Sequence, residues 1–346
     1  MAYTDIDKPS DYFETKLYTG NAGTLNVTGL DFQPDWVWIK NRTSDYTHGL
    51  YDSVRGAGSS KGIYSNTNEA EGTNSAFQNL TSFNSDGFSL GSTSNTNVIN
   101  TNSQNHVSWN WKAGTSFTND ASATGIGSID STGSVNTDAG FSIVTFTGNS
   151  GSIAHGLAQK PAMVIIKPRN VSGSWIVTHK GLGAEMQDYY LFLDTTAAKA
   201  TSNDIWGGEP TSTTFSVSSS LIDSANYVAY CFAEKKGYSK FGSYTGNGNA
   251  DGTFVYTGQK NAFVMIKKTS GTGNWCLFDN KRGVNGAMIQ LNPDVNNADN
   301  TSNYIDFLSN GFKCRNTASD KNASGGSYIY MAFAENPFVT STGVPA

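Results

Sequence analysis

The sequence predicts an all-β protein made of three tandem units of the β-sandwich or jelly-roll-like kind. Short runs of aromatic and β-branched residues alternate with Gly, Asn, Asp and Ser, which is the composition of strands joined by tight turns. One strand motif occurs three times within the 346 residues. No segment shows convincing helical periodicity, and an aromatic share of 12% excludes a disordered chain.

The most distinctive element of the repeat is an apolar strand that ends in a lysine. It reads "PDWVWIK", "PAMVIIK" and "NAFVMIK", and the closing lysines are Lys40, Lys167 and Lys267. We expect central buried strands whose lysines reach solvent at the edge of the sheet. A ring of lysines that binds a ligand is the alternative. The third copy lacks the proline of the other two, so we expect its strand to begin differently.

The remaining elements occur in the same order in each copy. A turn that begins at Tyr18, Phe146 or Tyr244 precedes the lysine strand, and a second strand carries Trp175 and Trp275 in the last two copies. Each copy ends in an alternating run, "HVSWNW", "YVAYCF" or "YIYMAF", with largely apolar or aromatic residues on both faces. This pattern is typical of a central strand that is covered on both sides.

These landmarks divide the chain into units at 1–113, 139–237 and 238–346, the last with a short C-terminal tail. The intervening stretch 114–138 has one aromatic residue and no Lys or Arg, so we expect a linker or a long surface loop there. The second and third units follow one another with almost no spacer. We therefore expect a fixed interface between these two units and a mobile first unit.

Charge and cysteine content narrow the class further. A net charge of −5 gives no electrostatic basis for binding nucleic acid. No apolar run approaches the ~20 residues of a spanning helix, and the first residues lack a secretory signal pattern. We therefore expect no membrane insertion and synthesis in the cytoplasm. Cys231, Cys276 and Cys314 lie inside apolar runs, which predicts buried free thiols.

The sharpest candidate for chemistry is a carboxylate followed three residues later by an arginine. Asp52 with Arg55 and Asp279 with Arg282 share this spacing, whereas the second unit has His179 and no arginine. Such a pair is either an acid/base or sugar-binding site, or an ion pair that holds a turn. Because no second carboxylate recurs in register, as a glycosidase requires, we favour the ion pair and assign no catalytic residue.

Metal and cofactor signals are weak. The four histidines show no metal-ligand spacing, and "GNGNADG" from Gly246 lacks the glycine spacing of a phosphate loop. The stretch 292–303 is rich in oxygen ligands, but it lacks the glycine and the closing glutamate of a calcium loop. We therefore expect no cofactor, and calcium stays an open alternative. The chemistry that remains is an Asn-, Thr- and Ser-rich surface, which suits glycan binding or a particle coat.

With these motifs established, the chain resembles a family of tailed-bacteriophage proteins, especially from marine phages and cyanophages. The resemblance lies in "DAGFSIVTFTGN", "HGLAQKPAMVIIKPRN", "YVAYCFAEKKGYSKFGSYTG", "FLSNGFKCRN" and "FQPDWVWIKNR", and it covers nearly the whole chain. Such proteins are often described as tail-fibre or lectin-like. The resemblance implies a virion structural protein, and it transfers no functional residue.

Three functions are consistent with this resemblance. The one we favour is a non-catalytic tail-fibre or host-recognition component whose partners are other virion proteins and a host cell-surface glycan. The alternatives are a capsid or tail decoration protein and a polysaccharide-degrading spike, although such spikes usually show repeats of ~20–30 residues. Only 15% of the residues are charged, and few lysines are present to prevent pairing between exposed strand edges. We therefore also expect a homo-oligomer, either a trimer or a larger symmetric assembly.

Overall fold

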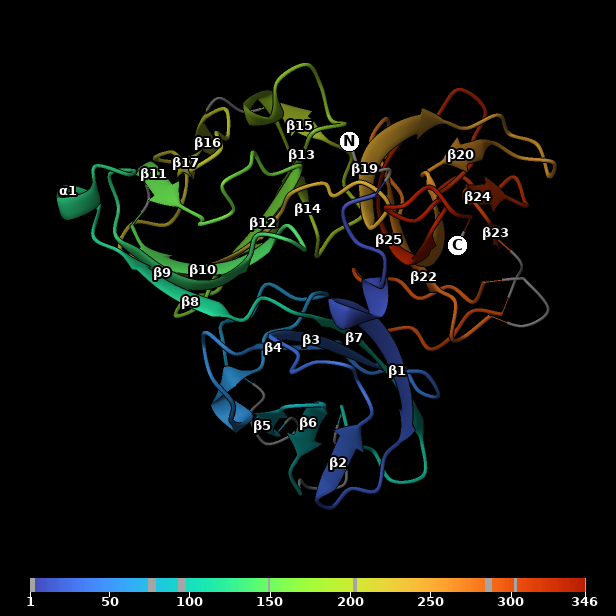
Figure 1. The fold of residues 1–346 in the computed structure, drawn as a ribbon, viewed down its shortest axis with the longest axis horizontal. Coiled ribbons are helices and arrows are strands. Elements are labelled where there is room, and N and C mark those ends of the chain that lie inside the picture. Colours follow the sequence, from blue (N-terminus) through green and yellow to red (C-terminus); the bar gives the residue numbers. More distant parts are fainter. Residues whose placement is uncertain are drawn as a thin grey trace.

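The computed structural model describes residues 4–73, 79–92, 98–148, 150–201, 204–283, 288–301 and 304–345. It confirms the all-β prediction, with 43% strand and 4% helix. Figure 1 shows three lobes, coloured blue, green to yellow, and orange to red, around a common centre. We name these lobes unit 1 (β1–β7), unit 2 (β8–β18) and unit 3 (β19–β25).

Units 1 and 3 have the same topology, a four-stranded sheet that packs on a three-stranded sheet. In unit 1 the four-stranded sheet has the order β1 (Phe13–Thr19), β7 (Asn105–Trp111), β3 (Trp36–Asn41) and β4 (Gly49–Asp52). Its three-stranded sheet has the order β2 (Leu25–Thr28), β6 (Gly87–Leu90) and β5 (Leu80–Asn84). In unit 3 the four-stranded sheet has the order β19 (Ser239–Thr245), β25 (Ser327–Pro337), β21 (Gln259–Lys268) and β22 (Trp275–Asp279). Its three-stranded sheet has the order β20 (Phe254–Tyr256), β24 (Gly311–Cys314) and β23 (Ile305–Leu308). The pairing is antiparallel throughout both units.

Unit 2 keeps this plan and extends its large sheet to eight strands. The order is β15 (Ala200–Thr201), β14 (Tyr189–Phe192), β13 (Ile176–His179), β12 (Met163–Pro168), β18 (Asn226–Phe232), β10 (Phe141–Thr147), β9 (Ser131–Asn136) and β8 (Thr115–Asn119). The small sheet contains β11 (Gly151–Ala154), β17 (Thr214–Val217) and β16 (Trp206–Gly208). These additional strands distinguish unit 2 from units 1 and 3.

The expected linker at 114–138 is instead folded. Its residues form β8, the short helix α1 (Ala121–Thr124) and β9, and β9 pairs with β10 along six residues. The turn between the strands is closed by Asp120, which caps α1 through the amide of Ala123, and by Gly125 at a φ of 67°. The stretch has few aromatic residues, but its threonine and valine residues also favour β-strands. Only residues 112–114 therefore connect the last strand of unit 1 to the first strand of unit 2.

The lysine-ending strands are central and buried, as predicted. Every residue of β3 and β12 is buried, and so are most residues of β21. β21 begins earlier, at Gln259, and its register shifts around Asn261, which stands where the other units have proline. The different entry of the third strand is thus confirmed, because an amide N–H can continue the ladder where proline cannot.

Alternate residues of these strands point into two different cores. In unit 1, Val37 and Ile39 face the small sheet, while Trp36 and Trp38 face away from it into a core that the three units share. Units 2 and 3 divide their residues in the same way. The second face of each central strand is therefore covered by the neighbouring units.

At the centre of the shared core, three equivalent rings touch one another. Trp111, Phe232 and Phe333 occupy the same register position in β7, β18 and β25. Their ring centroids are 5.8, 6.0 and 6.5 Å apart, which closes a triangle. Aromatic pairs at this spacing stabilise each other beyond the effect of burial alone. The chain therefore forms an internal pseudo-trimer.

The sequence repeat is also visible in smaller details. The ring that begins each turn motif stacks on the first ring of the closing strand, with centroid distances of 5.0, 5.2 and 5.0 Å; the pairs are Tyr18 with His106, Phe146 with Tyr227, and Tyr244 with Tyr328. Asn149 of the second turn motif lies outside the described residues. All three cysteines are free and buried, as expected. Among the described residues, no helix is long and apolar enough to span a membrane.

Candidate ligand-binding site

The first candidate pair, Asp52 and Arg55, lies buried at the seam between units 1 and 2. Arg55 Nε donates to Asp52 Oδ2 at 2.5 Å, and the Arg55 amide donates to Asp52 Oδ1. Tyr230 of unit 2 donates its hydroxyl to the same carboxylate at 2.7 Å. Glu71 then links Arg55 to Arg169 of unit 2. The ion pair holds its turn as predicted, and it also joins two units.

The second pair repeats this arrangement between units 3 and 1. Arg282 Nε donates to Asp279 Oδ2 at 2.6 Å, and Trp109 of unit 1 donates its indole N–H to the same carboxylate at 3.0 Å. Asp299 accepts hydrogen bonds from both Arg282 and Arg42 of unit 1. The side chains of both Asp–Arg pairs have no exposed area, so Asp52 and Asp279 are structural ion-pair partners.

The seam between units 2 and 3 uses neutral groups at the same positions. His179 pairs in register with Met163 as Asp52 does with Trp36. The residue of unit 3 that corresponds to Tyr230 is Met331, which has no donor, and His179 Nε2 instead donates to the backbone carbonyl of Tyr330 at 3.1 Å. Burial lowers the pKa of His179 to about 3, so the ring stays neutral.

A second set of equivalent contacts closes the ring of units. Trp175 of unit 2 donates to the carbonyl of Tyr64 in unit 1, and Trp275 of unit 3 donates to the carbonyl of Phe192 in unit 2. His48 completes the set, because it directly precedes Gly49, the partner of Ile39, and its Nε2 lies 3.0 Å from the carbonyl of Asn292 in unit 3. His48, His106 and His179 thus occupy positions that are equivalent to positions in the other units.

The prediction that the three lysines reach solvent is wrong. Lys40, Lys167 and Lys267 are completely buried, and their ammonium groups donate to the backbone carbonyls of Asn41, at the end of β3, and of Gly173 and Gly273, in the loops after β12 and β21. Burial lowers their pKa values to about 7, 8 and 8. Lys167 and Lys267 also reach the carbonyls of Asn68 and Thr195 in the neighbouring unit. Carbonyl acceptors at the end of the strand explain why these lysines do not extend into water.

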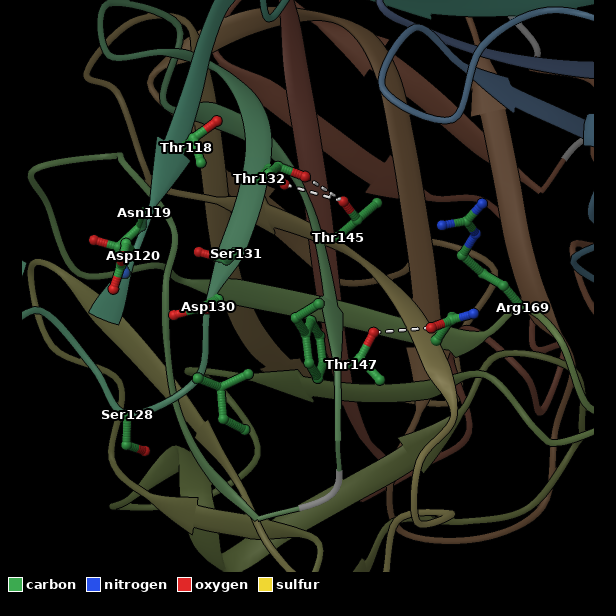
Figure 2. A pocket seen from close by; sticks show the side chains of 13 residues that line it. Thr118, Asn119, Asp120, Ser128, Asp130, Ser131, Thr132, Thr145, Thr147 and Arg169 are labelled. Atoms are coloured by element: carbon green, nitrogen blue, oxygen red, sulfur yellow. Dashed lines mark hydrogen bonds between the residues drawn. The ribbon is translucent and has the colours of Figure 1, made fainter. Parts of the chain in front are cut away.

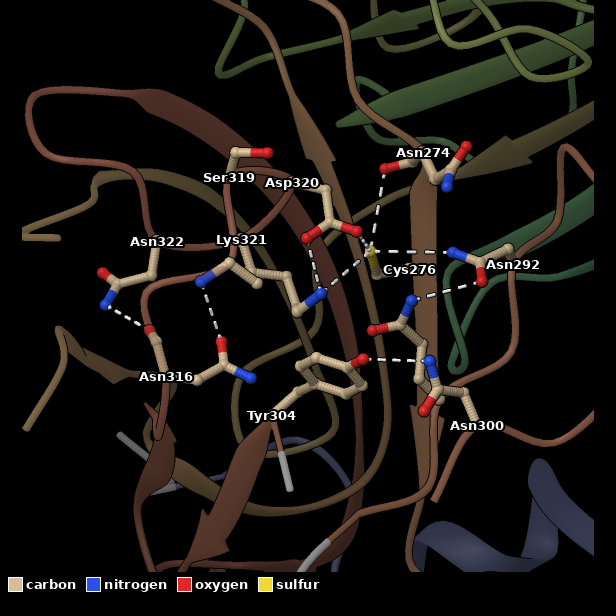
Figure 3. A network of polar contacts seen from close by, with 12 residues as sticks. Asn274, Cys276, Asn292, Asn300, Tyr304, Asn316, Ser319, Asp320, Lys321 and Asn322 are labelled. Carbon is tan, nitrogen blue, oxygen red and sulfur yellow. Dashed lines mark hydrogen bonds and ion pairs between the residues drawn. The ribbon is translucent and has the colours of Figure 1, made fainter. Parts of the chain in front are cut away.

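A dense polar network lies inside unit 3, in the region of the candidate calcium stretch (Figure 3). Lys321 pairs with Asp320 at 2.6 Å, lies 4.0 Å from the Tyr304 ring centroid, and approaches the Cys276 sulfur at 3.9 Å. Burial raises the pKa of the Cys276 thiol well above its usual value. A thiol of this kind is a poor nucleophile, because reactivity requires an accessible thiolate.

Side chains of the candidate calcium stretch instead bond to residues that lie at the seams between units. Asp294 accepts the Trp275 amide, Asn292 donates to the Trp275 carbonyl, and Asp299 joins two arginines. Ser302 and Asn303 lie outside the described residues. Within the described ranges, no group of three or more His, Cys, Asp or Glu side chains could hold a metal ion.

An open polar groove lies on unit 2, with a volume of about 760 Å³ (Figure 2). Its wall is the free end of the extended sheet, where β8, β9 and β10 display a ladder of threonines. Thr118 pairs with Thr132, and Thr132 pairs with Thr145, whose hydroxyl oxygens are 2.8 Å apart. These side chains are exposed or half-buried. The groove therefore presents a regular row of hydroxyl groups.

Charged and amide groups border this ladder. Thr147 donates to Asn226 at 2.8 Å, and Arg169 lies beside them, its Nε held by Glu71. At the other end of the groove are the carboxylates of Asp120 and Asp130, each of which accepts a backbone amide of α1. Hydrogen bonds from Ser122 and Ala123 lower the pKa of Asp120, so it is ionised at neutral pH.

This lining can hydrogen-bond a polyhydroxylated ligand along its length. Hydroxyl and amide groups both donate and accept, as sugar hydroxyls do. Most of the site comes from the stretch that we expected to be a linker, so sequence reasoning missed it. The available signal was the recurrence of Thr and Ser in "TSFTN" and "STGSVN", which places hydroxyl groups on one face of adjacent strands.

Comparison with known proteins gives a family without an assigned function. No curated protein matches the chain. A family model described as "Domain of unknown function (DUF7483)" matches residues 8–337, which include strands of all three units. The chain therefore belongs to the DUF7483 family of domains of unknown function.

Proposed function

We propose that the protein is a non-catalytic component of a bacteriophage particle that recognises a host-cell glycan. The observation that carries this proposal is the groove of unit 2, where hydroxyl, amide and guanidinium groups line an open polar surface. The resemblance of the sequence motifs to tail-fibre and lectin-like phage proteins supports the particle assignment. In this reading the protein is a tail-fibre or host-recognition component, and its partners are other virion proteins and a cell-surface polysaccharide.

Several observations favour binding over bond cleavage. The two carboxylates that a depolymerase would use, Asp52 and Asp279, are sealed in the seams and compensated by arginines. A general acid or base must reach its substrate within hydrogen-bond distance. The buried thiol of Cys276 is likewise closed to substrate. The polysaccharide-degrading spike is therefore the weakest of the three functions.

A coat or decoration protein is the second candidate, and the internal pseudo-trimer favours it. Three similar lobes around one axis match a site of threefold symmetry on a capsid or tail. The free edge of β8 is exposed and has no lysine, which supports pairing between copies. We therefore keep homo-oligomer formation as part of the proposal.

The binding proposal is tested with an array of bacterial surface polysaccharides and the variant Thr132→Val/Thr145→Val. Valine keeps the β-branched shape and removes two groove hydroxyls, so folding is expected to persist. Thr81→Val is the matched control, an exposed strand threonine of unit 1 whose hydroxyl also donates to a backbone carbonyl. We expect the double variant to lose about tenfold or more in affinity and the control to bind like wild type.

An array without any bound glycan, or a double variant that binds as wild type does, would overturn the groove assignment. The location is decided by copy number in purified particles. A small number of copies at the tail supports host recognition. Hundreds of copies over the head would overturn it in favour of the decoration protein.

A further inference from the structure

A second hollow lies where unit 2 meets unit 3, away from the threonine groove. It has a volume of about 380 Å³, and its lining includes Glu234, Lys236, Lys240, Tyr256 and Phe338. An adjoining hollow of about 370 Å³ shares Glu234 and adds Lys160 and Lys180. The two hollows therefore form one surface around a single carboxylate, which we name the Glu234 site.

The charge of the Glu234 site is opposite to that of the whole protein. Four lysines and one carboxylate line it, in a chain whose net charge is −5, and one of the lysines, Lys160, is paired with Glu209 outside the lining. Glu234 accepts hydrogen bonds from Lys180, from Lys240 at 2.6 Å and from the Phe241 amide at 3.1 Å. Burial alone would raise the pKa of Glu234, but these donors lower it overall. The carboxylate thus stays ionised and holds two ammonium groups in place.

Aromatic side chains line the same site and are open to water. Tyr256 is 59% exposed and Phe338 is 44% exposed. Large apolar side chains in this position gain little for folding, and grouped exposed apolar surface commonly marks a binding site. Phe254 is also 45% exposed, two residues before Tyr256 in β20, but it does not line the hollow.

Rings and ammonium groups together define the class of ligand. The apolar face of a pyranose can cover an aromatic ring, while an ammonium pairs with a carboxylate or sulfate substituent. Glu234 supplies one negative charge for the two ammonium groups that it holds, so the site keeps a positive charge that a neutral sugar would not compensate. A small inorganic anion would leave the rings uncovered. We propose that the Glu234 site binds an anionic saccharide, with a sugar ring against Tyr256 and Phe338 and its acidic group near Lys240 and Lys180.

This inference rests on the proposed glycan recognition and adds a site that selects acidic sugars. The test is titration calorimetry of the full chain with three probes: a tetragalacturonate, a sulfated galactan tetrasaccharide and neutral maltotetraose. We expect an acidic probe to bind more tightly than the neutral one, with an affinity that falls as salt is added. The two acidic probes distinguish carboxylated from sulfated ligands.

Two matched variants locate the binding. Tyr256→Ala removes the ring at the Glu234 site and is expected to weaken acidic-probe binding about tenfold or more. Phe254→Ala removes another exposed ring of the same strand outside the hollow and is expected to bind as wild type does. Thr132→Val/Thr145→Val is expected to leave acidic-probe binding unchanged.

Equal binding of the three probes, no binding of either acidic probe, or equal effects of Tyr256→Ala and Phe254→Ala would overturn the inference. Loss of acidic-probe binding in the groove variant would also overturn it, by assigning the ligand to the other site. If array glycans bind through the threonine groove and Tyr256→Ala changes nothing, the proposed function stands and the Glu234 site does not.

Discussion

The variant Asp52→Asn separates a structural from a catalytic role for the most conspicuous sequence motif. The wild-type carboxylate accepts from Arg55 Nε, the Arg55 amide and the Tyr230 hydroxyl, inside a seam where Asp52 and Arg55 have no exposed side-chain area. An asparagine amide would face these donors, and Arg55 would keep only Glu71 as a compensating charge. Breaking a buried ion pair of this kind costs about 3–5 kcal/mol.

The assay is urea denaturation followed by tryptophan fluorescence, with two reference variants. Tyr230→Phe removes one hydrogen bond to the charged group and is expected to cost about 1.5–3 kcal/mol. Lys260→Ala removes a solvent-exposed pair with Glu335 and is expected to change the free energy of unfolding by about 0.5 kcal/mol or less. An Asp52→Asn variant within about 1 kcal/mol of wild type, or one that loses a polysaccharide hydrolase activity at unchanged stability, would refute the reasoning.

Two further predictions concern the seams. The buried lysines have folded-state pKa values of about 7 to 8, below their unfolded value of 10.5. Above pH 7 the unfolded chain therefore binds more protons than the folded chain. The free energy of unfolding is thus expected to rise between pH 7 and pH 9. Lys167→Met should flatten this rise in a series of denaturation curves, and an unchanged slope would contradict the assignment. Trp275→Phe removes the hydrogen bond to the Phe192 carbonyl and is expected to cost about 1–3 kcal/mol in the same assay, because the carbonyl loses its partner; no measurable cost would show that the seam does not depend on this contact.

Much of the fold follows from the sequence, because the repeat sets the strands and their order. The alternation in "YVAYCF" correctly predicts a strand covered on both sides, but it cannot say that the second cover is another unit. That information lies in contacts between residues far apart in the chain, such as Phe232 with Phe333. Local patterns do not encode which surfaces meet.

The candidate site was less accessible to sequence reasoning for a related reason. Low aromatic content suggested a linker at 114–138, whereas neighbouring strand β10 provides a template on which Thr- and Ser-rich strands pair. We expected the lysines in water because ammonium groups are strongly hydrated, but the loops after the three strands provide carbonyl acceptors. The ion pair of Asp52 and Arg55 was predicted, and its bond to Tyr230 was not.

The contacts among Trp111, Phe232 and Phe333 join the three units in one shared core and so hold the two proposed binding surfaces in place. Native-state hydrogen exchange in increasing denaturant, read by mass spectrometry, tests it most directly. We expect the amides of β7, β18 and β25 to exchange through one opening reaction, with the same free energy and the same dependence on denaturant. If β7 loses protection at a lower denaturant concentration than β18 and β25, unit 1 unfolds on its own and the claim of a shared core is contradicted.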